Sequence, residues 1–513
     1  THQCDVTDAR NSQLEQSKGT PDGTRRDPQE RTVYNKECLV RVECPLEVSM
    51  QEPAAPVTKQ DGVTDAERYL GRLGTRSFLS LWSYPGVYRN TGPAGGHGKE
   101  VCDLLVVFRD DIIIFSDKDC AFPDKGDLWV DWGRWYHKAI LESANQVWGA
   151  ERFIRTNPQR LFIDRACQRP FPIALPPQDQ MRFHRVVVAH GTRKRCRAHL
   201  GGTGTLVLKP DIVGKAHYER DCEPFLIGDV DPTKGFVHVL DDISLDVVLG
   251  HLDTVADFIA YLTKKEAFYR SEKLALAGGE DDLLAYYLHD INDQEEHDFI
   301  YPAGTDAVVV EPGQWQLFSA SQAYVRQQEA NWVSGAWDAL IEEFGKHILG
   351  GTSIASTHFS VEEQERAVRM LAAEGRTARR ALGQSLFEIM RKTPPGKRSA
   401  RVMGPPRPGS AHYVFVILPQ GDMDETRYRQ VRRQVLEAYC MVLKVLFPEA
   451  LDLVGVATEP GEATARSQDV IYIDARDWTP EMQAQAEDLH AKGVLKNTRP
   501  IQRSTILEYP GSE

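Results

Sequence analysis

Long hydrophobic runs are missing from this sequence. No apolar stretch approaches the roughly 20 residues that a membrane-spanning helix requires, and no signal-peptide core opens the chain. The hydrophobic share of 41% and the charged share of 26% are ordinary for a globular protein. We therefore expect a cytoplasmic protein that is not held in a membrane.

The cysteines form no metal-binding or disulfide pattern. Nine of them are scattered along the chain, and no CxxC pair occurs. A zinc ribbon needs paired cysteines at short spacing, and a disulfide scaffold is typical of small secreted domains. The sequence predicts neither.

The chain also lacks an overall basic charge, since its formal net charge is −13. This value argues against a coat of basic residues around nucleic acid, although a handful of Lys and Arg can still form a local groove for phosphates. Two basic runs occur, at residues 193–197 and 392–407. Each is either a patch that contacts phosphates or a solvated loop.

A chain of 513 residues is too long for one compact core and indicates several domains. Residues 1–62 are polar with little periodicity, which predicts a disordered tail. A helix–strand–strand–helix unit follows over 63–165, and a mixed region, first β and then helical, over 166–391. Residues 392–410 are rich in Pro, Gly and basic side chains, as in a linker, and 411–513 predict a small C-terminal α/β domain. The predicted fold class is mixed α/β (α+β).

Two apolar strands separated by a charged turn form the most informative segment. Residues 102–108 and 112–115 are almost continuously apolar and are split by Arg-Asp-Asp, which is the signal of a β-hairpin. Strands this apolar belong in a sheet that is covered on both faces. Before the hairpin, Thr64 and Glu67 have the spacing of a capping box at the start of a helix. A long helix is predicted after it, over 133–154.

The register of this hairpin decides which polar side chains meet at its open end. With a two-residue turn at 110–111, Asp103 stands opposite Lys118, and with the turn at 109–110 it stands opposite Ser116. Because side chains alternate along a strand, either turn gathers Asp103, Ser116 and Lys118 on one face. A three-residue turn would instead place Asp103 opposite Asp117.

This pattern resembles the PD-(D/E)xK nuclease superfamily, whose core runs helix, strand, strand, helix with an Asp on the first motif strand. The second strand of that family carries an acid, or sometimes a Gln or Ser, two residues before a Lys. The matching positions are Asp103, Ser116 and Lys118, and Glu67 lies on the helix that often adds an acid to the family's metal site. The resemblance covers about residues 63–155 and implies a restriction-endonuclease-like domain.

The resemblance implies a metal-dependent nuclease that hydrolyses phosphodiester bonds. Its cofactor would be Mg²⁺ or Mn²⁺, and its partner nucleic acid, with DNA expected in preference to RNA. Mg²⁺ accepts one or two carboxylates and keeps several waters, so Asp103 with Glu67 would suffice. Lys118 would position the attacking water or stabilise negative charge in the transition state.

Ser116 departs from the usual pattern, because a neutral hydroxyl binds a hard cation more weakly than a carboxylate does. Asp117 would compensate as a metal ligand if its side chain turned inward or if its backbone carbonyl served as a ligand. If it does not, the alternative is a catalytically inactive nuclease fold that serves as a nucleic-acid-binding or scaffold module.

The long helix adds one candidate, since Lys138, Glu142 and Gln146 are spaced by four and share a face. The resemblance makes Gln146 a supporting residue of the site. Structural interpretations stand beside these roles: Glu67 as a capping-box partner, Asp103 with Lys118 as a surface ion pair, and Gln146 as an ordinary packing residue. The tryptophans at 129, 132, 135 and 148 are expected to pack in the core, although one of them could stack on a base.

A nuclease joined to large further regions resembles bacterial host-defence or restriction effectors, whose extra domains sense a trigger or bind partners. A homo-oligomer or a defence-system partner protein is compatible with that context. A last alternative places the function in the C-terminal domain, where His412, Asp474 and Asp477 are the polar candidates.

Overall fold

The computed structural model describes residues 2–7, 56–90, 98–353, 360–461, 467–496, 502–503 and 507–510, with the backbone alone at 2–7 and 502–503. The chain forms two compact units. Unit 1 comprises Thr1–Ser49 and Gly383–Ile506, and unit 2 comprises Met50–Leu382 and Leu507–Glu513. Each unit is therefore assembled from segments that are far apart in the sequence.

The main sheet of unit 2 has six strands in the order β5-β2-β3-β4-β6-β9. Neighbours from β5 to β4 pair antiparallel, whereas β4, β6 and β9 run parallel. Nearly every side chain of the central strands is buried, as their apolar sequences predict. The strands are β2 (Ser83–Arg89), β3 (Lys99–Phe108), β4 (Asp111–Lys118), β5 (Leu161–Phe162), β6 (Arg182–Ala189) and β9 (Val237–Leu240).

The β3–β4 hairpin has a two-residue turn at Arg109 and Asp110. Phe108 pairs with Asp111 and Leu104 pairs with Phe115, which fixes the register along the whole hairpin. Arg109 adopts φ 55°, the positive value that is common in tight hairpin turns. Of the three registers open to the sequence, the structure has the one with the turn at 109–110, which sets Asp103 opposite Ser116 when it is continued one residue past the pair Leu104 and Phe115.

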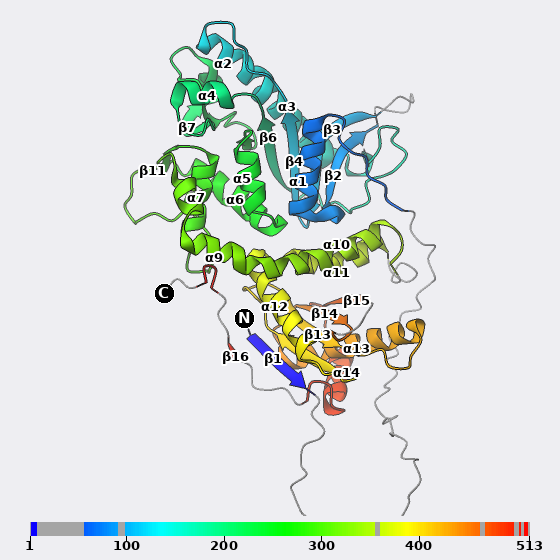
Figure 1. The fold of residues 1–513 in the computed structure, drawn as a ribbon. Helices are drawn as coiled ribbons and strands as arrows, with labels where there is room; N and C mark the ends of the chain where they lie inside the picture. The colour runs from blue at the N-terminus through cyan, green and yellow to red at the C-terminus, as the bar shows by residue number, and fades with distance from the viewer. Residues whose placement is uncertain are drawn as a thin grey trace, which may run out of the picture. The chain divides into compact units, whose positions relative to one another are not determined.

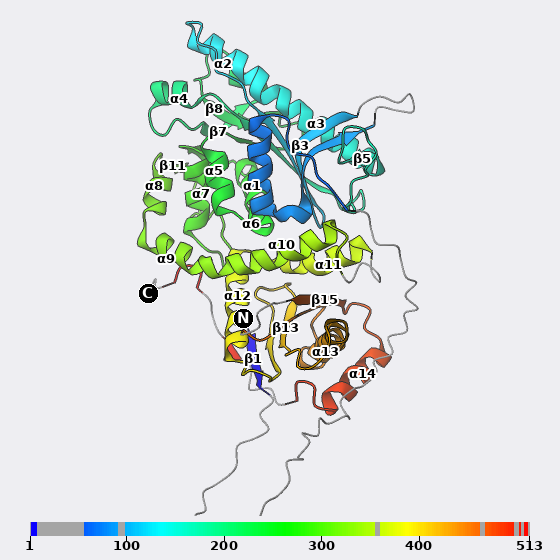
Figure 2. The same ribbon diagram turned by 45° about the vertical axis from the view of Figure 1, so that its right-hand side comes forward.

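Helices cover both faces of this sheet (Figures 1 and 2). On one face, Phe78 of α1 (Asp65–Trp82) lies 6.0 Å from Phe115, whose ring stacks on Phe258 of α6 (Val255–Arg270). On the other face, α3 (Glu142–Thr156) packs against β4 and β6. The helix predicted over 133–154 begins earlier, as α2 (Leu128–Tyr136), and joins α3 through a π-helical turn, η2 (His137–Leu141).

The rest of unit 2 contains a smaller sheet and further helices. The sheet has the order β11-β10-β7-β8, with strands β7 (Val207–Val213), β8 (Leu226–Asp229), β10 (Leu274–Ala277) and β11 (Val308–Val310). The helices are α4 (Arg193–Leu200), α5 (Ser244–His251), α7 (Glu280–His289), α8 (Gln314–Ser319), α9 (Gln322–Asn331), α10 (Gly335–Leu349) and α11 (Val361–Ala372), with short turns η3 (Pro158–Arg160), η4 (Gly214–Tyr218) and η5 (Trp332–Ser334).

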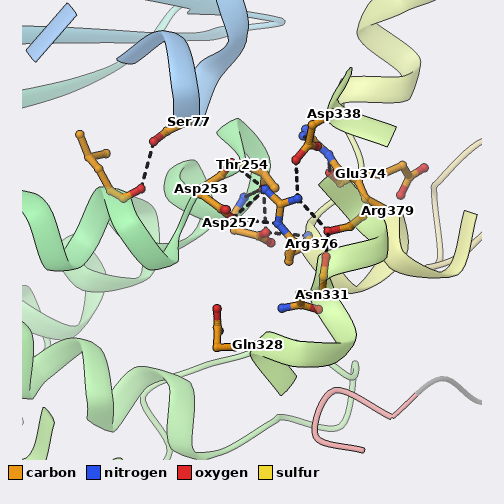
Figure 3. A network of polar contacts seen from close by, with 12 residues as sticks. Ser77, Asp253, Thr254, Asp257, Gln328, Asn331, Asp338, Glu374, Arg376 and Arg379 are labelled. Atoms are coloured by element: carbon orange, nitrogen blue, oxygen red, sulfur yellow. Dashed lines mark hydrogen bonds and ion pairs between the residues drawn. The ribbon is translucent and has the colours of Figure 1, made fainter. Parts of the chain in front are cut away.

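A buried ionic network ties the helices of unit 2 together at Arg376, the first residue of α12 (Arg376–Lys392) (Figure 3). Its guanidinium donates to Asp253 at 2.8 Å and to Asp338 of α10 at 2.5 Å. Its backbone N–H donates to Asp257 of α6 at 2.8 Å. The two carboxylates on the guanidinium thereby compensate its charge, which a charge buried this deeply requires.

Unit 1 is built around a six-stranded sheet with the order β15-β14-β13-β12-β1-β16. The long helix α13 (Glu425–Leu446), seen nearly end-on in Figure 2, buries Leu436, Cys440 and Leu443 in the unit's core. The strands are β1 (His2–Thr7), β12 (Ser399–Met403), β13 (His412–Ile417), β14 (Asp452–Thr458), β15 (Gln468–Asp474) and β16 (Gln502–Arg503), and α14 (Pro480–Ala491) follows β15.

The mixed α/β class is confirmed, with three mixed sheets in the described part of the chain. Three domain expectations differ from the structure. Residues 63–165 do not form a separate domain, because their sheet also contains β6 and β9, which lie beyond residue 165. The expected linker contains β12, and the expected disordered tail contains β1, which pairs with β12. The remainder of the tail up to residue 55 lies outside the described residues.

Among the described residues, no helix is long and apolar enough to cross a bilayer.

Candidate functional site

Asp103 lies near the open end of the β3–β4 hairpin and is only 8% exposed. Its Oδ2 accepts a hydrogen bond from the backbone N–H of Asp117 at 2.6 Å. Burial raises the pKa of the Asp103 carboxyl to about 7, and repulsion from Glu100 and Glu67 adds to the rise against the opposing effect of that hydrogen bond. The carboxyl therefore titrates near neutrality, where small changes in its surroundings decide its charge.

Ser116 and Gln146 are brought together on the same face as Asp103. Ser116 follows Phe115, the last residue of β4 paired with β3, so continuing the register by one residue sets it opposite Asp103. Its Oγ donates to Gln146 Oε1 of α3 at 3.3 Å. Ser116 is 1% exposed, so its hydroxyl has little access to solvent. Gln146 thus lies where the resemblance puts a supporting residue, while its role in catalysis stays a prediction.

Lys118 is the last residue of β4 and lies two positions beyond Ser116, on the same face of the strand. Its backbone is fixed by parallel pairing with Ala189 of β6. The side chain is half-buried and has no ion-pair or hydrogen-bond partner among the described residues. No surface ion pair between Asp103 and Lys118 forms, so the ammonium group is available to an anionic ligand.

Glu67 is the capping-box residue of α1. Its Oε2 accepts from the backbone N–H of Val63 at 2.6 Å and of Thr64 at 3.3 Å, and Thr64 Oγ1 accepts from the Glu67 N–H. The structural interpretation of Glu67 is thus confirmed. Its charge nevertheless raises the pKa of Asp103 and of Glu100. The same carboxylate can cap the helix and contribute to the field at the site.

Asp117 faces the opposite side of the sheet, and the expectation that its side chain joins Asp103 as a metal ligand is wrong. Because side chains alternate along β4, the carboxylate that follows Ser116 must point away from it. The side chain of Asp117 is 1% exposed, and its Oδ1 lies 2.8 Å from His190 Nε2. Asp117 contacts Asp103 through its backbone N–H, and its charge adds a small rise to the pKa of Asp103.

His190, which sequence reasoning did not assign to this site, links Asp117 to Asp242. Its Nδ1 lies 2.6 Å from Asp242 Oδ1. Burial opposes protonation, but the hydrogen bonds and charges of the two carboxylates raise the pKa of His190 to about 10. The sequence signal that could have found this pair is the position of each residue after a strand. His190 is the first residue after β6, and Asp242 is the second residue after β9. The carboxyl ends of neighbouring parallel strands lie at the same edge of a sheet, which brings the two side chains together.

Glu100 is a second acid that sequence reasoning passed over. Burial and the charge of Glu67 raise the pKa of Glu100, and Arg165 opposes the rise. Glu100 lines a pocket of about 540 Å³ with Lys99 of β3 and with Asn145 and Gln146 of α3. The signal was a charged residue at the start of a strand that is otherwise apolar.

The prediction of a metal site rests on few acidic ligands. In the part of the chain that the structure describes, no three His, Cys, Asp or Glu side chains are placed to hold one ion together. Asp103, with Glu67 or Glu100 at longer range, remains the available donor set. Mg²⁺ is compatible with so few carboxylates because water completes its coordination.

The polar candidates of the C-terminal domain are not gathered into a site. His412 lies 3.9 Å from Glu449, and Asp474 pairs with Arg476 at 2.8 Å. These are local ion pairs of unit 1.

Comparison with protein-family models, with curated proteins and with solved structures found no match to this chain.

Proposed function

We propose that unit 2 is a metal-dependent nuclease of the PD-(D/E)xK type that hydrolyses phosphodiester bonds, with DNA preferred over RNA. The observation that carries the proposal is the hydrogen bond that Asp103, at the open end of a buried hairpin, accepts from the backbone of β4 at Asp117, between Ser116 and Lys118. Helix α1 before the hairpin and helix α3 after it support the proposal, although strand β2 adds a strand to the expected order between α1 and the hairpin. The hydrogen bond from Ser116 to Gln146 supports it as well.

The acids near Asp103 fit a divalent cation electrostatically. Glu67 and Glu100 raise the pKa of Asp103 by repulsion, so bound positive charge would be favoured there. Asp103 would hold Mg²⁺ or Mn²⁺, with Glu67 or Glu100 assisting. When bound, such an ion polarises a phosphoryl oxygen and lowers the pKa of a coordinated water.

The neighbouring side chains would orient and stabilise the reacting groups. The half-buried Lys118 presents a positive charge on the face of Asp103, where it would stabilise a phosphate in the transition state. Ser116 holds Gln146 by a hydrogen bond and so fixes that amide beside the site. The Asp117 N–H fixes one oxygen of Asp103 and leaves the other free to bind a ligand.

One observation favours the alternative function of an inactive nuclease fold that binds nucleic acid. Ser116 occupies the position of the second acid, and the adjacent Asp117 is committed to His190 on the far face of the sheet. If a second carboxylate is indispensable, the protein binds without cutting.

A cleavage assay separates the two functions. The full-length protein is incubated with plasmid, linear DNA and RNA in Mg²⁺, Mn²⁺ or EDTA. We expect metal-dependent cutting that falls at least ~100-fold in Asp103→Asn and in Lys118→Ala. The matched controls are Asp110→Asn, at the closed end of the same hairpin, and Lys346→Ala, an exposed lysine of α10.

Cutting that is equal in all four variants would refute the site. Binding of nucleic acid without cutting by the wild-type protein would establish the inactive fold instead.

A further inference from the structure

A second part of unit 2 combines exposed aromatic and basic side chains. Helix α2 and the turn η4 enclose a pocket of about 530 Å³ whose lining includes Trp129, Arg134, Tyr218 and Arg220. Helix α4 lies beside α2 in both views (Figures 1 and 2), and His199 of α4 contacts the Trp129 ring edge-on at 6.1 Å. We refer to this pocket and α4 together as the α2–α4 surface.

Trp129 differs from its neighbouring tryptophans. The indole N–H of Trp132 donates to the His217 carbonyl at 2.7 Å, and that of Trp135 donates to the carbonyls of Cys120 and His190 at 3.1 Å. Trp129 is 37% exposed, and its indole N–H has no hydrogen-bond partner among the described residues. An open aromatic ring at a pocket is suited to stacking against another flat ring.

The basic run at 193–197 is a helix, not a loop, and it supplies positive charge beside this pocket. Arg193, Lys194 and Arg197 are exposed and form no ion pair in the described structure. Arg195 is paired with Asp124 at 3.1 Å. Three cations on one short helix, in a chain of net charge −13, form a local surface for phosphates.

The pocket itself carries cations that are only partly neutralised. Arg134 lies 3.5 Å from Asp131, and its side chain remains 56% exposed. Arg220 lies 3.2 Å from Asp127 and remains 83% exposed. The pair of Arg220 with Asp127 is exposed on both sides and therefore weak, so the Arg220 guanidinium can exchange its carboxylate for a phosphate. Asp131 is buried, so Arg134 contributes through the exposed part of its guanidinium.

The α2–α4 surface is built on the connections that leave the sheet near the candidate site. Helix α2 follows Lys118 of β4 after a nine-residue connection, 119–127, and α4 begins four residues after β6 ends. The Trp135 indole joins these two connections through its bonds to Cys120 and His190. A strand lying on this surface would therefore run towards the end of the sheet that carries Lys118.

We propose that the α2–α4 surface binds single-stranded nucleic acid, with an unpaired base stacked on Trp129 and the adjoining phosphates on α4. A paired base is stacked inside its duplex and cannot enter the pocket, whereas an unpaired base can. The inference rests on the proposed nuclease function and specifies its substrate as a strand with unpaired nucleotides.

Binding is measured in EDTA, so that cutting does not interfere. The full-length chain is titrated into fluorescently labelled oligothymidine, oligouridine and a blunt DNA duplex, and anisotropy is recorded. We expect tighter binding of the single strands and a loss of roughly 5- to 100-fold in Trp129→Ala. Trp129→Phe keeps an aromatic face and should restore most of that affinity. Trp332→Ala, at an 85% exposed tryptophan elsewhere in unit 2, is the matched control.

A charge reversal tests the phosphate-binding role of α4 separately. Lys194→Glu should weaken the binding of single strands. It should also reduce the slope of log binding constant against log salt concentration by about 0.7 for each phosphate that is no longer neutralised. Lys346→Glu, the control, should change neither the affinity nor the slope. The inference would be overturned if Trp129→Ala bound single strands as tightly as Trp332→Ala does. It would also be overturned if Trp129→Ala lost the same affinity for the duplex as for the single strands. Cleavage would still proceed in that case if the proposed function is right. A wild-type protein that neither binds nor cuts would overturn both.

Discussion

At the scale of single residues, Asp103 shows how burial and neighbouring charge act together on one carboxyl. It is held by a hydrogen bond on one oxygen and faces the charges of Glu67 and Glu100. Its pKa is about 7 instead of 3.8. Near pH 7 the folded protein therefore binds a proton at this position that the unfolded chain has already released.

This difference makes the stability of the metal-free protein depend on pH. The contribution of Asp103 to stability falls as pH rises from about 4 to 7, because over that range this carboxyl binds more protons in the folded state than in the unfolded state. Asn imitates the neutral carboxyl and can still accept the Asp117 N–H. Asp103→Asn should therefore stabilise the protein above pH 7 by up to about 4 kcal/mol, from about three pH units at 1.4 kcal/mol each.

At pH 4 the same substitution should have little effect. Urea unfolding in EDTA at pH 4 and pH 8 measures both values, with Asp110→Asn as the control. An equal effect of Asp103→Asn at the two pH values would contradict the assigned cause.

At the scale of elements, two glycines show how closely the helices α1 and α3 pack where they cover the sheet. Gly74 of α1 faces Leu104 of β3 and Ser83 of β2, and a Cβ built there would lie 2.7 Å from Leu104 Cδ2 and 2.9 Å from Ser83 Oγ. Gly149 of α3 has no atom within 4 Å of its Cβ position. The two helical glycines therefore have different roles, one in packing and one without a steric requirement.

Alanine substitution separates these roles. Gly74→Ala should destabilise unit 2 by about 1–3 kcal/mol, because leucine and serine side chains must shift in a packed core. Gly149→Ala should be neutral or stabilising by up to about 1 kcal/mol, since alanine favours a helix. Urea unfolding of the two variants provides the comparison, and a Gly74→Ala protein as stable as the wild type would show that α1 is not closely packed on β3.

At the scale of the whole molecule, the end of the chain returns to unit 2. Leu507–Glu513 belong to that unit, although the preceding residues from Gly383 to Ile506 belong to unit 1. Glu508 accepts a hydrogen bond from Gln327 of α9 at 2.5 Å and one from Thr377 of α12, and it lies 3.7 Å from His297. Burial opposes ionisation, but the hydrogen bonds and charge of His297 and Thr377, together with the charge of Arg380, lower the pKa of Glu508 to about 2.

The C-terminal segment should therefore contribute to the stability of unit 2. A group whose pKa is lowered on folding contributes stability above the unfolded pKa of 4.5 and loses it as pH falls towards 2. Glu508→Gln should cost about 2–3 kcal/mol at pH 7 and little near pH 2. Truncation after Ile506 should cost at least as much.

Chemical unfolding at the two pH values tests this expectation. Glu329→Gln, on the exposed side of α9, is the matched control. A truncated protein whose unit 2 unfolds like the wild type would show that the segment does not stabilise it.

The sequence by itself determined the local geometry of the candidate site. Two short apolar strands around a charged turn predict the hairpin, and for either two-residue turn the alternation of side chains places Asp103, Ser116 and Lys118 on one face. The structure then selected the turn at 109–110 over the three-residue turn. The capping box of Thr64 and Glu67 follows from a spacing of three residues. These features depend on neighbours within a few tens of residues, so their physical causes can be read along the chain.

Only the tertiary structure decided what surrounds that hairpin. The parallel alignment of β4, β6 and β9 places His190 and Asp242 beside Asp117 and so holds its carboxylate in an ionic contact on the face of the sheet opposite Asp103. Long-range pairing likewise made β12 a central strand within an apparent linker and joined both chain ends to distant segments. Interactions between residues that lie far apart in the sequence depend on the packing of the whole core, and no local pattern specifies them.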